Sequence, residues 1–357
     1  MLAAFYDPTI SYEENYKKGP PIFSQNLTPP PRYITKKYKF LGFDVNLPFG
    51  IPPGPLLNSE YMKAAFEWGF DVSTYKTVRA SEFPCHPFPN VLYVETNNEL
   101  HPDQTPRLTA FNETNKPFEK ISITNSFGVP SRPANIWQED VKKALSYIGE
   151  GQLMILSFMG TVKENQTQEE FINDFAQAAK LSVETGVKAV EANLSCPNIG
   201  NEGLVCYNTE VTEAVCHAIR QEIGDTPLIL KIGYYKDIAQ LEKIAKIANS
   251  YAAGIAAINT LQIEVVDKDG KQALPGKNRL RSGVCGASIK WAGLEMVKKL
   301  HEIRKRNNYN YEIIGIGGVM TPSDYNEYRI AGADCVQSAT GAMWNPNLAN
   351  DIALLGK

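Results

Sequence analysis

The chain has 357 residues, of which 43% are hydrophobic, so it can bury a large core in one large α/β domain or in two ordinary ones. Its formal net charge is −3 and its lysines and arginines are scattered, which argues against nucleic acid or an anionic membrane as a partner. No apolar run approaches the ~20 residues that span a bilayer, and the N-terminus does not resemble a signal peptide, so we expect a cytoplasmic protein.

The first 45 residues are expected to form an extended arm. They are polar and rich in tyrosine, and Gly19-Pro20-Pro21 and Pro29-Pro30-Pro31 interrupt them. This composition suits extended backbone better than an independent core. We therefore expect an arm at 1–45, which wraps the domain or a partner subunit, and one domain at 46–357.

From residue 48 onward, strand-like apolar runs alternate with helical patterns. Strands are predicted at 48–51, 71–78, 153–158, 187–193, 227–232, 254–259, 311–316 and 334–337. Helices are predicted at 59–68, 168–184, 209–223, 237–249, 287–306 and 323–330, with a last helix at the C-terminus. Eight such strands favour an α/β fold of the (β/α)8 TIM-barrel class over an open doubly wound sheet. Insertions at 80–133 and 261–286 interrupt the alternation, and we expect them on the face that carries the site.

Polar residues and glycines gather near the ends of the predicted strands, where barrels of this class carry their chemistry. They are Lys76, Asn193, Lys231, Asn259, Gly317 and Thr340. The stretch Gly315-Ile316-Gly317-Gly318 closes the seventh strand, and Ser338-Ala339-Thr340-Gly341 closes the eighth. Backbone N–H groups of two such loops commonly bind phosphate in these barrels. A glycine pair alone would be weak support, because turns need glycine in any case.

Two lysines follow buried strands. Lys231 ends the run Leu228-Ile229-Leu230, and Lys76 ends Val72-Ser73-Thr74-Tyr75. Such a lysine is either a solvated ammonium at a frayed strand end or a cation held opposite an anionic ligand. The two lysines together with the phosphate pocket favour a phosphorylated cofactor whose ring gains negative charge, and reduced FMN fits this description.

The stretch Asn193-Leu194-Ser195-Cys196-Pro197-Asn198 places two amides, a hydroxyl and a thiol within six residues. A cysteine can move a proton, and asparagine amides can bind a planar ligand that carries both donors and acceptors. A structural turn with a buried cysteine explains the stretch equally well.

The other cysteines and the histidines do not indicate a metal site. The six cysteines contain no CxxC pair, and the four histidines show no ligand spacing. We therefore expect neither a zinc site nor an iron–sulfur cluster.

Four motifs together resemble one family. They are Asn193-Leu194-Ser195-Cys196-Pro197-Asn198, Asn125-Ser126-Phe127-Gly128-Val129-Pro130, Tyr75-Lys76-Thr77 and Ile316-Gly317-Gly318. In this order they are similar to the dihydroorotate dehydrogenases of the soluble, cysteine-using class, over residues 46–350. The resemblance implies an FMN-containing (β/α)8 barrel that oxidises dihydroorotate to orotate in pyrimidine biosynthesis. The membrane-bound class of this family has serine in place of Cys196.

The resemblance also implies roles for individual residues. Cys196 would be the general base that removes the C5 proton while a hydride passes from C6 to flavin N5, and Lys76 would lie near both flavin and substrate. The expected substrate contacts are Asn125, Asn193, Asn198, Asn259 and Thr260, with the backbone N–H groups of Phe127, Gly128 and Val129 at the carboxylate. The expected cofactor contacts are Gly54, Lys76, Asn193, Lys231, Asn259, Gly286, Gly317, Gly318, Ala339 and Thr340.

Several positions depart from the family pattern. Pro52 and Pro53 stand where small residues usually touch the flavin, so one backbone donor to the cofactor is missing. Ala339 and Cys285 each replace a common glycine. These changes concern details of the FMN contacts and leave the expected fold unaltered.

Two other functions fit the motifs. The segments 66–70 and 271–286 are also similar to the FMN domain of dihydropyrimidine dehydrogenases, which reduce uracil or thymine. That branch usually has histidine where Asn198 stands, lacks a comparable carboxylate loop and depends on iron–sulfur relays, which a partner subunit would have to supply. A flavin-binding barrel without turnover is the third interpretation.

By resemblance we expect a homodimer, with an electron-transfer subunit as a possible partner. The sequence does not indicate the electron acceptor.

Overall fold

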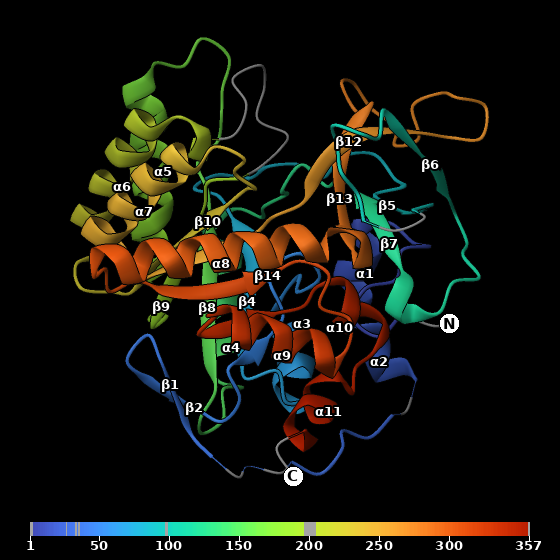
Figure 1. Ribbon diagram of the computed structural model, residues 1–357, viewed down its shortest axis with the longest axis horizontal. Coiled ribbons are helices and arrows are strands. Elements are labelled where there is room, and N and C mark those ends of the chain that lie inside the picture. The colour runs from blue at the N-terminus through green and yellow to red at the C-terminus, as the bar shows by residue number, and fades with distance from the viewer. Residues whose placement is uncertain are drawn as a thin grey trace.

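A parallel sheet of eight strands lies at the centre of the computed structural model, which describes residues 3–25, 27–32, 34, 36–96, 99–195 and 205–355 (Figure 1). In hydrogen-bonded order the strands are β3 (Phe49–Gly50), β15 (Cys335–Gln337), β14 (Glu312–Ile316), β11 (Gly254–Ala257), β10 (Leu228–Ile232), β9 (Ala189–Asn193), β8 (Leu153–Phe158) and β4 (Val72–Val78). The two end strands meet where Thr74 N donates to Ile51 O at 2.8 Å. The predicted (β/α)8 barrel is therefore confirmed.

Helices surround the barrel. They are α3 (Ser59–Glu67), α4 (Ala134–Leu145), α5 (Gln168–Val183), α6 (Thr209–Ile223), α7 (Ile238–Tyr251), α8 (Lys290–Asn307), α9 (Pro322–Ala331), α10 (Thr340–Trp344) and α11 (Leu348–Leu354). Single 3-10 turns lie at η1 (Phe118–Lys120), η2 (Val205–Tyr207) and η3 (Ala287–Ile289). At the start of α5, Thr167 and Glu170 form a reciprocal capping box that satisfies two otherwise unpaired N–H groups. The sequence analysis did not predict α4, which covers the second barrel strand.

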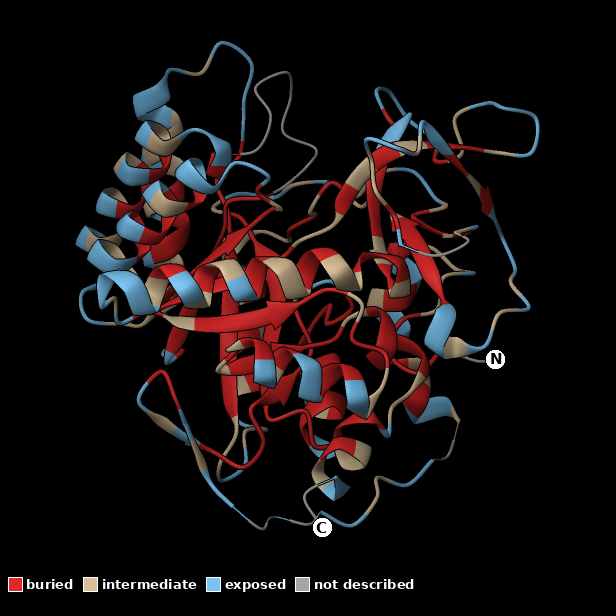
Figure 2. Cartoon of the chain, viewed as in Figure 1, coloured by how far each residue is buried: buried red, intermediate tan, exposed pale blue. Residues whose placement is uncertain are grey.

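The barrel strands are buried on both faces. All residues of β4, β8, β9 and β10 are buried, whereas most of the surrounding helices bury one side and expose the other (Figure 2). The short helix α10 is buried throughout. Parallel strands covered on both faces appear in a sequence as nearly continuous apolar runs. This is why the strand positions could be predicted closely.

The two insertions come together as a second, smaller closed barrel. It consists of β5 (Val91–Val94), β6 (Arg107–Phe111), β7 (Ser122–Asn125), β12 (Leu261–Val266) and β13 (Arg281–Gly286). β13 pairs antiparallel with β7, which brings Gly283 opposite Asn125. We call these five strands the roof, because with the loops beside them they cover the carboxyl ends of the main barrel strands (Figure 1).

The N-terminal segment contains short helices and a hairpin as well as extended backbone. α1 (Tyr12–Lys18) begins at a capping box between Ser11 and Glu14, and α2 (Pro21–Ser24) follows it. β1 (Tyr38–Phe40) and β2 (Phe43–Val45) form a hairpin that packs against the amino-terminal ends of barrel strands, where Leu41 N donates to the Glu312 carboxylate. No helix in the part of the chain that the structure describes has the length and apolar character needed to cross a membrane.

Candidate active site

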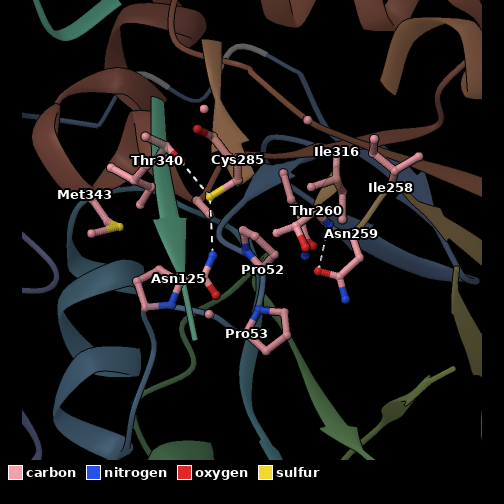
Figure 3. Close-up of a pocket in the computed structure, with 18 of the residues that line it drawn as sticks. Pro52, Pro53, Asn125, Ile258, Asn259, Thr260, Cys285, Ile316, Thr340 and Met343 are labelled. Carbon is pink, nitrogen blue, oxygen red and sulfur yellow. Dashed lines mark hydrogen bonds between the residues drawn. The ribbon is translucent and has the colours of Figure 1, made fainter. Parts of the chain in front are cut away.

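One cavity lies between the carboxyl ends of the main barrel strands and the roof (Figure 3). Every predicted site residue that the structure describes lines this cavity: Gly54, Lys76, Asn125, Phe127, Gly128, Val129, Asn193, Lys231, Asn259, Thr260, Gly286, Gly317, Gly318, Ala339 and Thr340. Cys196 and Asn198 lie outside the described residues. The chain therefore brings the predicted residues together in space, although they come from segments far apart in the sequence.

Both predicted lysines are buried beneath the cavity. Lys231 is 5% exposed and Lys76 is 7% exposed, so neither is a solvated ammonium at a frayed strand end. Burial lowers the pKa of Lys231, and the nearby carboxylate of Glu191 acts in the opposite direction. A buried ammonium group is unfavourable unless a negative charge lies close to it. A ligand that gains negative charge here would therefore be stabilised.

Glu191 lines the same cavity and was not among the predicted site residues. It is fully buried, and neither of its carboxylate oxygens has a hydrogen-bond partner in the described part of the chain. The available signal was its position two residues before Asn193 on one strand, which places both side chains on the same face.

A hydrogen-bond network fixes the orientation of two predicted asparagines. Asn259 Nδ2 donates to the carbonyl oxygen and to the hydroxyl of Ser195, at 3.0 Å in each case. Ser195 N donates to Asn193 Oδ1 at 3.2 Å, and Thr260 N donates to Asn259 Oδ1 at 3.0 Å. The amide groups therefore have defined directions, which is what recognition of a flat ring with donors and acceptors on its edge requires.

Residues 125–130 begin at the last residue of β7, and we call them the carboxylate loop after the role expected from the sequence. Gly128 has φ +76° and Val129 has φ +54°, a left-handed conformation that is unfavourable for a β-branched residue. No N–H of Phe127, Gly128 or Val129 donates a hydrogen bond to any described residue. These three groups are therefore available to an anion.

Arg79 holds this loop in place. Its Nε donates to Val129 O at 2.9 Å and its Nη2 donates to Gly128 O at 3.1 Å, while Nη1 donates to Gly160 O at 3.0 Å. One guanidinium thus ties the strained turn to the segment that follows β8. The sequence analysis missed Arg79, and the only signal was its position three residues after Lys76.

A second arginine, Arg279, lies beside the same loop. It is 8% exposed, its guanidinium donates to the Ser126 hydroxyl, and burial lowers its pKa to about 10. Among the described residues it forms no ion pair with a carboxylate. Buried positive charge therefore lies beside the carboxylate loop, which favours an anionic group near this loop.

The glycine-rich loops after β14 and β15 form the opposite side of the cavity. Gly317 and Gly318 have φ +132° and +64°. A Cβ atom on Gly318 would lie 2.7 Å from Lys290 N, so this loop packs too closely on the start of α8 for a side chain. Both glycines also line the cavity, and backbone N–H groups of such loops commonly bind phosphate.

Gln337, which was not predicted, offers a further contact for a planar cofactor. It lies on β15 and is fully buried, and its Nε2 donates to Val72 O and Thr74 Oγ1 at 3.0 Å each. Gln337 is among the residues that line the cavity, and its Oε1 has no hydrogen-bond partner among the described residues. This orphaned acceptor fits a ring N–H of a cofactor such as the flavin of FMN, because a buried acceptor without a partner is costly.

The positions that depart from the family pattern also line the cavity. Cys285 accepts weak hydrogen bonds from Asn125 Nδ2 at 3.6 Å and Thr340 Oγ1 at 3.5 Å, so its thiol joins the roof to α10 (Figure 3). Burial raises the pKa of this thiol, which keeps it protonated. Pro52 and Pro53 present rings and no N–H donors to the cavity (Figure 3).

No group of three or more histidine, cysteine, aspartate or glutamate side chains in the described ranges is arranged to hold a metal ion. Among the described residues, the chemistry that the cavity offers comes from amides, lysines, a buried carboxylate and backbone N–H groups.

Comparison with known proteins assigns the family. Residues 95–353 match the sequence model described as dihydroorotate dehydrogenase. The chain belongs to the dihydroorotate dehydrogenase family. It is 36% identical over 358 residues to the dihydroorotate dehydrogenase of Dictyostelium discoideum, which covers 96% of this chain and 95% of that protein.

Prokaryotic relatives match a smaller part of the chain. The catalytic subunit of a dihydroorotate dehydrogenase B (NAD(+)) from Methanocaldococcus jannaschii is 27% identical over 222 residues, which is 62% of this chain and 66% of that protein. A dihydroorotate dehydrogenase A (fumarate) from Lactiplantibacillus plantarum is 32% identical over 183 residues, or 50% of this chain and 55% of that protein. These dihydroorotate dehydrogenases are named for different electron acceptors, so the family alone does not assign one to this chain.

Proposed function

We propose that this protein oxidises dihydroorotate to orotate with bound FMN. The observation that carries the proposal is the similarity along almost the whole chain to a protein named dihydroorotate dehydrogenase. The carboxylate loop beside Arg279 supports it, because dihydroorotate carries a carboxylate that dihydrouracil lacks, and buried cations favour an anionic substrate.

The cofactor would lie between the barrel floor and the glycine-rich loops. The residues that would hold it are Gly54, Lys76, Asn193, Lys231, Asn259, Gly286, Gly317, Gly318, Ala339 and Thr340. Lys231 would stabilise negative charge on the ring, and the backbone after β14 and β15 would hold the phosphate. Bound FMN would supply the hydride acceptor for C6 of the substrate.

The substrate would lie against the carboxylate loop. The N–H groups of Phe127, Gly128 and Val129 would bind its carboxylate, and Asn125, Asn193, Asn198, Asn259 and Thr260 would pair with its ring carbonyl and N–H groups. Lys76 would be close to both substrate and cofactor. The fixed directions of Asn193 and Asn259 would orient the ring before the reaction begins.

Cys196 would act as the general base that removes the C5 proton. A thiol with an ordinary pKa of about 8.5 needs only a modest downward shift to act as a base near neutral pH. Cys196 follows directly after Ser195, which the hydrogen bonds from Asn259 hold in place at the end of β9.

An anaerobic half-reaction tests this proposal. The purified protein with FMN is expected to lose its yellow absorbance when dihydroorotate is added, and to respond far more weakly to dihydrouracil. Cys196→Ala should keep FMN and lose most of the bleaching, whereas Cys216→Ala, in a buried cysteine on α6 outside the cavity, should bleach normally. Equal bleaching by the two dihydropyrimidines would contradict the assignment of dihydroorotate as substrate.

We further propose that the protein forms a homodimer, with an electron-transfer subunit as a possible additional partner. The names of the relatives, which include an NAD(+)-dependent catalytic subunit and a fumarate-dependent enzyme, support testing both acceptors. Light scattering of the purified chain measures the oligomeric state, and turnover with fumarate in the absence of any other protein would exclude a need for a partner.

A further inference from the structure

The N-terminal arm reaches the candidate active site, although it lies outside residues 95–353 that match the family. Ala4 N donates to Met343 O at 2.6 Å, and Ala4 O accepts a hydrogen bond from Ile22 N at 2.9 Å. Gln25 Nε2 donates to Ala3 O at 2.9 Å. The start of the arm is therefore fixed on both sides, against α10 and against α2 (Figure 1).

Two consecutive aromatic residues of the arm have different surroundings. Phe5 is fully buried and packs edge to face against Phe70, with ring centroids 5.6 Å apart. Tyr6 lines the active-site cavity and packs edge to face against Phe127 of the carboxylate loop, at 5.5 Å. Phe5 thus anchors the segment in the core, and this anchor places Tyr6 in the wall of the cavity next to the expected carboxylate position.

The hydroxyl of Tyr6 has no hydrogen-bond partner among the described residues, although the side chain is only 2% exposed. Burial raises the pKa of this phenol well above its usual value, so the group is a neutral donor rather than a base. A buried donor without an acceptor is unfavourable in a native structure, and a ligand in the cavity that supplied the acceptor would remove this cost.

We propose that the Tyr6 hydroxyl is a substrate-binding group that donates a hydrogen bond to the carboxylate of the bound dihydropyrimidine. This inference rests on the proposed function, because it requires a carboxylated ligand at the loop that includes Phe127. The N-terminal arm is then a component of the substrate site, and Tyr6 adds a side-chain donor to the three backbone N–H groups of that loop.

Three FMN-loaded proteins test the proposal: the wild type, Tyr6→Phe and Tyr12→Phe. Tyr12 is the matched control because its ring also contacts Phe127, at 6.0 Å, but it lines a different cavity beside Glu13 and Arg132. Each protein is titrated with orotate, and the change in flavin absorbance is followed. The dissociation constant of FMN is measured separately for each protein.

The dissociation constant for orotate should rise about tenfold in Tyr6→Phe, as expected for the loss of a hydrogen bond to a charged acceptor. It should stay unchanged in Tyr12→Phe, and FMN affinity should be the same in all three. Wild-type orotate affinity in Tyr6→Phe, or an equal loss of orotate and FMN affinity, overturns the role of Tyr6. A wild type that binds FMN but no orotate would instead refute the proposed function.

Discussion

Replacing Arg79 by lysine should weaken binding of carboxylated ligands without loss of the cofactor. The Arg79 guanidinium donates to Val129 O and Gly128 O in the carboxylate loop, and to Gly160 O and Thr161 Oγ1 after β8. A lysine ammonium is a point donor on a flexible stem, and it cannot reach both segments with the geometry of a planar fork. The variant therefore loses the hydrogen bonds on at least one side.

The magnitude follows from the backbone that Arg79 supports. A non-glycine residue held at positive φ costs roughly 1–3 kcal/mol, and Val129 at φ +54° is such a residue. Without the guanidinium, the strained turn is disfavoured by about this amount relative to a relaxed loop. The fraction of protein whose loop can bind the carboxylate then falls, and the apparent dissociation constant of the carboxylated ligand rises. A change of about 1–3 kcal/mol corresponds to roughly a 5- to 150-fold weaker complex.

Titration of the FMN-loaded Arg79→Lys variant with orotate measures this loss, and retention of FMN shows that the barrel is intact. Arg132→Lys is the control, because Arg132 lies just after the same loop but pairs with Glu13 on the surface. If Arg79→Lys bound orotate within twofold of the wild type, the loop would not depend on the guanidinium, and the reasoning would be wrong.

Two further substitutions test the cavity and the pH dependence of stability. Gly318→Ala should abolish FMN retention, because the new Cβ would lie 2.7 Å from Lys290 N. Gly186→Ala is the control and should retain FMN, because Gly186 is also at positive φ but has open space around it. Gel filtration with added FMN compares the two variants, and equal retention of FMN would contradict the importance of the close approach at Gly318. Burial raises the pKa of Glu312 from its ordinary value of 4.5 to about 7. Between these two pH values the folded state keeps a proton on Glu312 that the unfolded state has lost. The free energy of unfolding therefore falls as the pH rises through this range. Glu312→Gln should remove this part of the fall when urea unfolding is compared at pH 5 and pH 8, and an unchanged pH dependence would contradict the assignment.

The barrel and most of its site could be predicted because they depend on local sequence signals. Strands buried on both faces appear as apolar runs, and the polar residues Lys76, Asn193 and Lys231 lie within two residues of the carboxyl ends of their strands. α4 was missed because it follows a long insertion, although Trp137, Val141 and Ala144 are its buried positions at helical spacing.

The remaining site residues were missed because tertiary contacts define them. Arg79 matters through carbonyl groups 49 and 50 residues away in the chain, and Gln337 through a hydrogen bond to a residue 265 positions away. Tyr6 lies in a segment whose composition predicted only an extended arm. The local sequence does not indicate which distant backbone groups or cavity such a residue will contact.

The roof links the two insertions at the cavity. Its strands β7 and β13 are neighbours that come from segments about 160 residues apart, and they carry Asn125 on one and Cys285 and Gly286 on the other. A substitution in either insertion can therefore shift residues of both strands at the cavity, because the strands are hydrogen-bonded to each other. The eight central strands need not move when this happens.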